Sequence, residues 1–427
     1  MSVLLLLAAL PLAAIVIVSG FRSPLGVLVL AYAAIVPFGS ATDLPIPLPP
    51  PFNTLSSLAG LVAFLGMLVH LLVVRRGSAS LPPAIPLWLI FLGVAGLTFA
   101  WSVDRTATAD QLLLLASVMA IYVLTALMPV RQVDVQRIGT AIIAGAAFAS
   151  LIGIGLFVAG RAPIGKSGVP RFLITGNDPN HTAAGLLLPL LLAVSRTVDR
   201  RQRPANRTLA IGGVALMTTG ILLTGSRGGV LAAVVGIVVI MLCGGSTRRA
   251  VSLVVVLGVA VALALRQAPA SLEGRLVETS STGRTDIWQL GLDTCPTYCV
   301  RGSGFGSFPA VYEEEFRTNP DGGGYRTAGF RAHNIWLQGL IETGLTGLLL
   351  LVLAFAAAAR DVWKLQREDR GPPLGALLAL AIASSLISNL TFKYFWLVLM
   401  YAAVVVSAAD HTKRELSAEP VGTMESV

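Results

Sequence analysis

Arg227 combines a charged side chain with a setting in which charge is costly. It follows Thr224-Gly225-Ser226 and precedes two glycines, between apolar runs that leave almost no loop. A cation at the edge of hydrocarbon is usually paired or functional, and glycines let a ligand approach the backbone. The alternative is an arginine that reaches out to the lipid headgroups. We interpret Arg227 as functional.

Arg284 lies in a segment rich in Ser and Thr, ahead of the apolar spacing of Ile287 and Leu290. This pattern predicts an N-capped helix on the outer membrane surface. Asp286 suits the positive end of that helix, whereas Arg284 opposes it. A cation there is favourable if an anion docks beside it. Otherwise Arg284 is a solvated loop charge or a partner of Asp286.

His333 ends a long polar segment, immediately before an apolar run that begins at Asn334. A lone histidine is more often structural than catalytic. This one is expected at an aqueous interface near Arg326 and Arg331, where it can act as acid, base or hydrogen-bond donor. It is the only side chain we expect near the arginines that titrates around neutrality unaided.

A polar stripe follows His333. Asn334, Gln338 and Glu342 are spaced i, i+4, i+8 and therefore share one face of a helix. Glu342 then lies roughly 12 Å inside that helix, too far round it to touch His333. A carboxylate at this depth needs a partner. We expect a cation or hydrogen-bond donor on a neighbouring helix, with Arg227 as the leading candidate.

The elements that must position these residues are membrane helices. The chain of 427 residues is 55% hydrophobic and 12% charged, with a mean hydropathy of +0.78, which excludes a water-soluble globule. Apolar runs predict an all-α polytopic membrane protein with about 12 or 13 spans. The N-terminus has no positive region typical of a removable signal peptide, so we expect the first helix to stay. Examples of the runs are 55–74, 84–101, 111–127, 138–159 and 334–359.

Short loops rich in Lys and Arg indicate the cytoplasmic side. Alternation of the spans then places His333 and both arginines outside, and the net charge of +9 reflects topology, with no nucleic-acid partner expected. The predicted cytoplasmic clusters are 75–76, 131–137, 196–207, 248–249, 360–370 and 413–414. The predicted outside segments are 102–109, 160–180, 225–227, 266–331 and 389–393.

We divide the chain into four parts. Residues 1–265 form N-terminal and central helices, 266–333 an extracytoplasmic loop that caps the active site, 334–409 the C-terminal helices and 410–427 a disordered cytoplasmic tail. In the loop, the spacing of Cys295 and Cys299 permits a disulfide. Two cysteines without a second pair indicate a metal site only weakly. Cys243, in an apolar run, is expected to pack.

Several segments of the second half resemble the O-antigen ligase and polymerase superfamily. The most specific of them is His-Asn-x-x-Leu followed by Glu-x-Gly-x-x-Gly. The first half agrees only as a series of hydrophobic spans. The segments that carry the resemblance are Ser226-Arg227-Gly228, 283–288, 302–308 and 332–347.

This resemblance implies a GT-C-like glycosyltransferase. Its partners would be a glycan donor on a polyprenyl (undecaprenyl) diphosphate carrier and an acceptor hydroxyl of a glycan or glycolipid, such as lipopolysaccharide core, at the outer face of the inner (cytoplasmic) membrane. By motif, Arg227, Arg284 and His333 are catalytic, and both arginines bind diphosphate. Transfer would invert the anomeric centre, without metal or cofactor. Supporting residues would be Asn334, Glu342, Arg331 and Arg326.

The residues agree with this assignment. A diphosphate leaving group gains negative charge as the sugar bond breaks, and guanidinium binds phosphate oxygens bidentately. Clustered outside carboxylates occur only at 313–315, and such a run is usually a solvated face. The alternative is a transporter or flippase of lipid-linked glycans, which would also need outside arginines. It would usually show matched broken helices in two halves, and no such repeat is present in the sequence.

A non-catalytic scaffold leaves the arginines unexplained. Ligase and polymerase both fit the residues, and the acceptor, the sugar and the linkage stay open.

Overall fold

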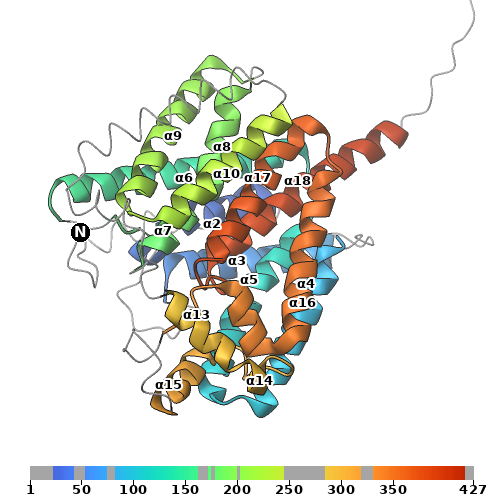
Figure 1. Cartoon of the computed structure of the whole chain (residues 1–427). Helices are drawn as coiled ribbons and strands as arrows, with labels where there is room; N and C mark the ends of the chain where they lie inside the picture. Colours follow the sequence, from blue (N-terminus) through green and yellow to red (C-terminus); the bar gives the residue numbers. More distant parts are fainter. Residues whose placement is uncertain are drawn as a thin grey trace, which may run out of the picture.

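The computed structural model describes residues 23–42, 53–74, 82–161, 172–174, 178–199, 202–244, 284–318 and 330–418. Helices are the only regular elements in those ranges (Figure 1). Nine helices of the described part are long and apolar enough to cross a membrane. The prediction of an all-α polytopic membrane protein is therefore confirmed. The expected total of about 12 or 13 spans includes residues 1–22 and 245–283, which lie outside the described ranges.

The apolar runs predicted at 84–101 and 334–359 correspond closely to observed helices. The run at 111–127 belongs to a longer helix, because Asp104 caps its start by accepting a hydrogen bond from Ala107 N at 3.0 Å. The candidate spans are α3 (Leu55–Val69) with η3 (His70–Val74), α4 (Ala84–Leu97) with η4 (Thr98–Trp101), α5 (Arg105–Leu127), α6 (Gln132–Val158), α7 (Pro179–Gly185) with α8 (Leu187–Val198), α9 (Pro204–Leu223), α10 (Arg227–Gly244), α16 (Ile335–Trp363) and α18 (Lys393–Ala418).

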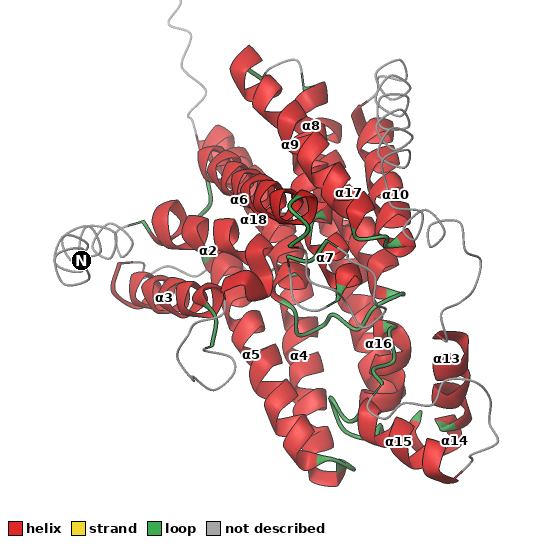
Figure 2. Cartoon of the chain, turned by 90° about the vertical axis from the view of Figure 1, so that its left-hand side faces the viewer, coloured by secondary structure: helices red, strands yellow, loops and turns green. Residues whose placement is uncertain are grey.

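Shorter elements complete the described part. They are η1 (Leu25–Val29), α2 (Leu30–Ile35), η2 (Val36–Thr42), α13 (Arg284–Asp293), α14 (Cys295–Tyr298), α15 (Phe308–Thr318) and α17 (Arg367–Ser384). Figure 2 shows α13, α14 and α15 together beside α16 and away from α6, α8 and α9. These three helices form the described part of the predicted cap, and the division into four parts stays a prediction.

Aromatic side chains fill the centre of the bundle. Trp88 on α4 is fully buried and packs edge to face against Trp396 on α18, with ring centroids 4.9 Å apart. It also meets Phe355 on α16 at 6.0 Å. Such pairs contribute about 0.5–1.5 kcal/mol beyond the burial of their area. They therefore fix α4, α16 and α18 relative to one another, and α16 leads directly to His333.

The predicted loop docks onto a kink in α16. Gly344 has a φ of 71°, which interrupts the helix and frees the carbonyls before it. Ser303 N donates to Ile341 O at 2.8 Å, and Gly304 N donates to the Glu342 carbonyl at 3.0 Å. The backbone groups left unpaired by the kink are thus satisfied by the loop.

Gly304 is a position in this loop where only glycine fits. Its φ of 116° disfavours any other residue, and an added Cβ would collide with the side chain of Ser102. The next residue, Phe305, donates its N–H to Thr98 Oγ1 at 2.9 Å. The loop is therefore wedged between α16 and the junction of η4 with α5.

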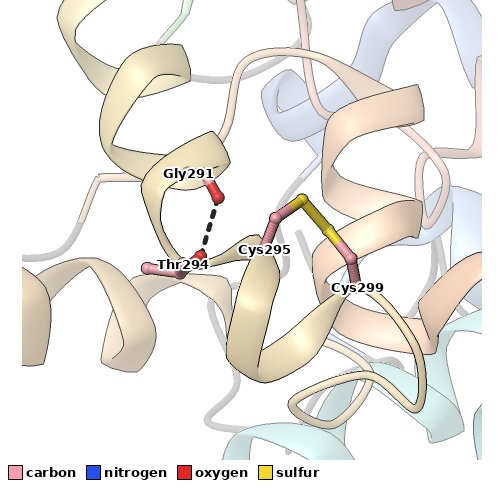
Figure 3. Close-up of a disulfide and its surroundings, with 4 residues drawn as sticks. All are labelled: Gly291, Thr294, Cys295 and Cys299. Atoms are coloured by element: carbon pink, nitrogen blue, oxygen red, sulfur yellow. Dashed lines mark hydrogen bonds between the residues drawn. A yellow bond between two sulfur atoms is a disulfide. The ribbon is translucent and has the colours of Figure 1, made fainter.

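The cap helices have a small core of their own. Ile287, Phe308, Val311, Ala332 and Ile341 are all buried in it. Cys295 and Cys299 form a disulfide one helical turn apart, with Cα atoms 4.6 Å apart (Figure 3). The same view shows the Thr294 hydroxyl donating to Gly291 O at 2.7 Å at the end of α13.

The tail prediction is wrong for residues 410–418, because α18 continues to Ala418. Two ion pairs at helical spacing support this extension: His411 with Glu415 at 3.4 Å and Lys413 with Asp410 at 3.9 Å. Residues 419–427 lie outside the described ranges. Cys243 is half-buried and packs against the main core, as expected.

Candidate active site

Arg227 is the first residue of α10, and its side chain is exposed. The Ser226 hydroxyl before it accepts a hydrogen bond from Gly229 N at 3.2 Å and so caps the helix. The same hydroxyl donates to Asn180 Oδ1 at 2.8 Å. Ser226 is 2% exposed, so these bonds are shielded from water. They join the start of α10 to the start of α7.

The start of α7 carries a carboxylate that the sequence interpretation missed. Asp178 is the N-cap, and its side chain accepts from Asn180 N at 2.7 Å and from Asn180 Nδ2 at 3.0 Å. Pro179 occupies the first helical position, where its missing N–H costs nothing. The Asp-Pro pair in a segment predicted outside was a signal for this helix start.

Arg284, the first residue of α13, belongs to the same electrostatic neighbourhood. Burial lowers the pKa of Arg284, the Asp178 carboxylate opposes that fall, and the Arg227 cation adds to it. Such effects require the charges to be close in space. Residues of α7, α10 and α13 that are far apart in the sequence therefore form one charged cluster.

His333 completes the cluster from the start of α16. Its φ of 48° is uncommon for a residue other than glycine. Asn334, the next residue, caps α16 by accepting from Trp336 N at 2.9 Å and from Leu337 N at 3.2 Å. Trp288 Nε1 of α13 donates to Ala332 O at 2.9 Å. This bond ties the helix that carries Arg284 to the segment that carries His333.

The surroundings of the His333 imidazole favour its neutral form. Burial lowers its pKa, the nearby Arg284 and Arg331 lower it further, and the Asp178 carboxylate raises it in part. Its Nδ1 is buried and has no hydrogen-bond partner among the residues that the structure describes. A neutral imidazole with an unused nitrogen can accept a proton.

His181 is a second histidine at the site, which the sequence interpretation did not place beside the arginines. Its Nδ1 lies 2.8 Å from Tyr394 Oη, and its ring stacks on Phe392 at 4.0 Å. The charges of Arg331 and His333 act on it electrostatically. It lies on α7, three residues after Asp178, and the sequence interpretation did not single it out.

Glu342 has hydrogen-bond donors as partners, but Arg227 is not among them, so that part of the prediction is wrong. The carboxylate is fully buried, and its Oε1 accepts from Gln338 Nε2 at 3.0 Å and from Phe308 N at 3.2 Å. Phe308 begins α15, where backbone N–H groups have no helical acceptor. The cap therefore supplies the donor, and Glu342 anchors the cap.

Arg331 is exposed, and its charge acts on His333, His181 and Glu342. Arg326 lies outside the described residues. In the acidic run at 313–315, Arg317 pairs with Glu313 at 3.2 Å and with Glu314 at 3.5 Å, and all three side chains are largely exposed. This run therefore behaves as a solvated face.

Segments predicted on the same side of the membrane contact one another. Val103 N donates to Ser303 O at 2.9 Å, and the Thr391 hydroxyl donates to Gln111 Oε1 at 3.3 Å. Arg367, predicted on the opposite side, bonds instead to carbonyls at the far end of α10. Which of the two sides faces outward stays a prediction.

Comparisons with known proteins find similarity in the part of the chain that carries Arg227, Arg284 and His333. Residues 212–352 match the family model described as O-Antigen ligase. The exopolysaccharide production protein ExoQ of Rhizobium meliloti (strain 1021) is 30% identical over 116 residues, which are 24% of this chain and 25% of ExoQ. The match thus spans a quarter of that relative. Arg227, Arg284, His333 and Glu342 all lie inside residues 212–352. These matches confirm the resemblance of the chain to the O-antigen ligase and polymerase superfamily.

Proposed function

We propose that this protein is a glycosyltransferase that moves a glycan from a polyprenyl-diphosphate carrier to an acceptor hydroxyl at the outer face of the cytoplasmic membrane. One observation carries the proposal: Arg227, Arg284 and His333 come from three separate helix starts, the charge of Arg227 acts on Arg284, the charge of Arg284 acts on His333, and the Asp178 carboxylate acts on both Arg284 and His333. The family match supports glycan transfer.

The two arginines suit a diphosphate. Without a ligand they repel each other, since the charge of Arg227 lowers the pKa of Arg284. The Asp178 carboxylate offsets this repulsion at Arg284, so burial is the main reason that the pKa of Arg284 is lowered. A diphosphate would place further negative charge beside both cations and accept bidentate hydrogen bonds from each guanidinium group. Because charge grows on the leaving diphosphate as the sugar bond breaks, the same contacts would strengthen in the transition state.

His333 would act as the general base. The acceptor oxygen forms a bond to the anomeric carbon as the bond from that carbon to the phosphate oxygen breaks. The electron pair leaves with the polyprenyl diphosphate, and the hydroxyl proton passes to the imidazole. Burial and Arg284 keep that imidazole neutral before reaction. Negative charge on the bound diphosphate would raise its pKa again and so favour proton acceptance.

Incubation of the purified protein with a polyprenyl-diphosphate-linked glycan and an acceptor tests the proposal. We expect release of free polyprenyl diphosphate, which a flippase of lipid-linked glycans would not cause. Arg227→Lys and Arg284→Lys should each slow release, since lysine lacks the bidentate fork. Arg317→Lys, on the solvated face of α15, is the matched control. Unchanged release by both active-site variants, with normal folding, would contradict the roles assigned to the arginines.

A further inference from the structure

The disulfide between Cys295 and Cys299 encloses α14, the single helical turn that follows α13 (Figure 3). A helix of 4 residues does not hold itself in water, because forming the first turn is unfavourable. The hydrogen bond from Cys299 N to Cys295 O, at 2.9 Å, spans the same residues as the disulfide. The covalent bond therefore keeps this turn closed.

The turn supplies a hydrogen-bond acceptor to the kink of α16. Cys299 O accepts from Leu345 N at 2.8 Å, and Leu345 is the residue after Gly344. A Cβ added at Gly344 would collide with the backbone of Val300. The chain beside Cys299 is thus packed directly against the kink, so the position of the Cys299 carbonyl depends on the shape of α14.

The chain after the turn continues along α16. Gly302 N donates to Tyr298 O at 2.7 Å, which connects the end of α14 to the glycine-rich loop. The next two residues, Ser303 and Gly304, donate to carbonyls of α16. The disulfide therefore lies at the start of the row of hydrogen bonds that holds the cap on α16.

α13 connects the same turn to the candidate active site. This helix runs from Arg284 to Asp293, and Cys295 follows after one residue. Trp288 of α13 bonds to Ala332, just before the start of α16. A change in the shape of α14 therefore acts on the end of the helix that begins with Arg284.

The sulfur atoms lie at the edge of the cap. Cys295 and Cys299 are half-buried, Pro296 and Thr297 between them are exposed, and Val300 is 81% exposed. Exposed disulfides are the ones that exchange with external thiols. This disulfide closes a short loop, so it constrains the unfolded chain less than one that closes a long loop. Its main effect is on the local geometry of the cap.

We infer that Cys295 and Cys299 are a site of thiol–disulfide exchange with an external dithiol protein, and that their reduction slows transfer by loosening the cap on α16. The effect on transfer rests on the proposed function. Both cysteines are positioning residues, because they act through the place of Arg284.

The exchange involves two electrons and two thiols of the partner. A thiolate of the partner attacks one of the two sulfur atoms, and the electron pair of the disulfide bond leaves on the other sulfur, which takes up a proton. The second thiol of the partner, as a thiolate, then displaces the first cysteine, which is protonated in turn. The partner is oxidised to a disulfide, and this chain is reduced to a dithiol.

Thiol chemistry confined to this pair tests the inference. The sequence has 3 cysteines, so Cys243→Ser leaves Cys295 and Cys299 as the only ones. That variant is compared in its oxidised form, after reduction by thioredoxin, and after reduction followed by bridging with dibromomethane. The bridge places a methylene group between the two sulfur atoms and resists reductants. It therefore restores the covalent link without restoring the disulfide.

We expect the reduced form to transfer glycan at least about fivefold more slowly than the oxidised form, because a misplacement of about 1 Å can cost about a hundredfold. The bridged form should transfer as the oxidised form does. Cys295→Ser combined with Cys299→Ser should give the reduced rate with or without thioredoxin. Equal rates of the reduced and oxidised forms would overturn the inference, as would a disulfide that thioredoxin reduces only in unfolded protein.

Hydrogen exchange separates this inference from the proposed function. The Leu345 amide loses its acceptor when the turn opens, so it should exchange at least about tenfold faster in the reduced form than in the bridged form. Ala354, fully buried in the middle of α16, is the control and should not change. If the oxidised protein transfers no glycan, the proposed function fails, and the exchange rates alone decide this inference. An unchanged rate at Leu345 would overturn it even in an active enzyme.

Discussion

Ser226 offers a quantitative test of how the site is assembled. Its buried hydroxyl caps α10 through Gly229 N and bonds to Asn180 on α7. Ser226→Ala removes both bonds at once. Loss of an N-cap costs about 1 kcal/mol, and loss of a neutral hydrogen bond costs about 1 kcal/mol more. We therefore expect the free energy of unfolding to fall by about 2 kcal/mol.

A double-mutant cycle isolates the link between the two helices. Asn180→Ala removes the same interhelical bond from the other side, so the two substitutions should share about 1 kcal/mol of their effects. The cycle is measured on the free energy of unfolding, by SDS titration of the purified protein, and on the rate of glycan transfer. In the transfer rates, the coupling between the two substitutions should amount to a factor of about five, since each 1.4 kcal/mol corresponds to a tenfold change.

The control is a cap that is remote from Asn180. Asp104→Ala removes the N-cap of α5, which accepts from Ala107 N at 3.0 Å. Its effect should add to that of Asn180→Ala within about 0.5 kcal/mol. If Ser226→Ala and Asn180→Ala also prove additive within that limit, the bond between α7 and α10 does not set the position of Arg227, and our account of the site's assembly is refuted.

Three further outcomes can be measured. Transfer should fall as pH drops through the pKa of His333, which lies below its ordinary value because of burial and Arg284, and His333→Ala should abolish transfer while donor binding persists. Asp178→Asn keeps the N-cap but removes a carboxylate that raises this pKa, so the acid limb of the pH–rate profile should move to lower pH; a move to higher pH would contradict the account. Glu342→Ala leaves Phe308 N without an acceptor and should lower the free energy of unfolding by roughly 3 kcal/mol, and Glu342→Gln should lower it less. Equal free energies of unfolding for the wild type and both variants would show that Glu342 does not anchor the cap.

Sequence reasoning located the charged residues of the site because the cost of a charge beside hydrocarbon depends on local sequence. Arg227 stood out for this reason, and Arg284 stood out because a cation is unfavourable at a helix N-terminus. Asp178 and His181 did not, because Asp178 looks like an ordinary helix cap and His181 lies in the short polar stretch that follows it. Their importance arises from contacts with α10, α16 and α18, which no local pattern encodes.

The partner of Glu342 was predicted wrongly because it is set by tertiary contacts. From the sequence, a buried carboxylate calls for a cation or a hydrogen-bond donor on a neighbouring helix, and Arg227 was the leading candidate. The donor from outside α16 is the backbone N–H of Phe308. Every residue except proline has such an N–H, so the sequence does not single this one out. Phe308 reaches Glu342 because the Gly344 kink leaves carbonyls of α16 free to accept hydrogen bonds from the loop.

This arrangement gives α16 two tasks along its length. At its start it presents His333, and about two turns later Glu342 and the Gly344 kink hold the cap that carries Arg284. Trp288 closes the connection by bonding to Ala332 beside the histidine. The proposed base and one proposed diphosphate contact are thus connected to a single helix, so a substitution at the anchor should misplace Arg284 relative to His333 without touching either residue. We therefore expect the His-Asn motif and the Glu-x-Gly motif to act as one structural unit.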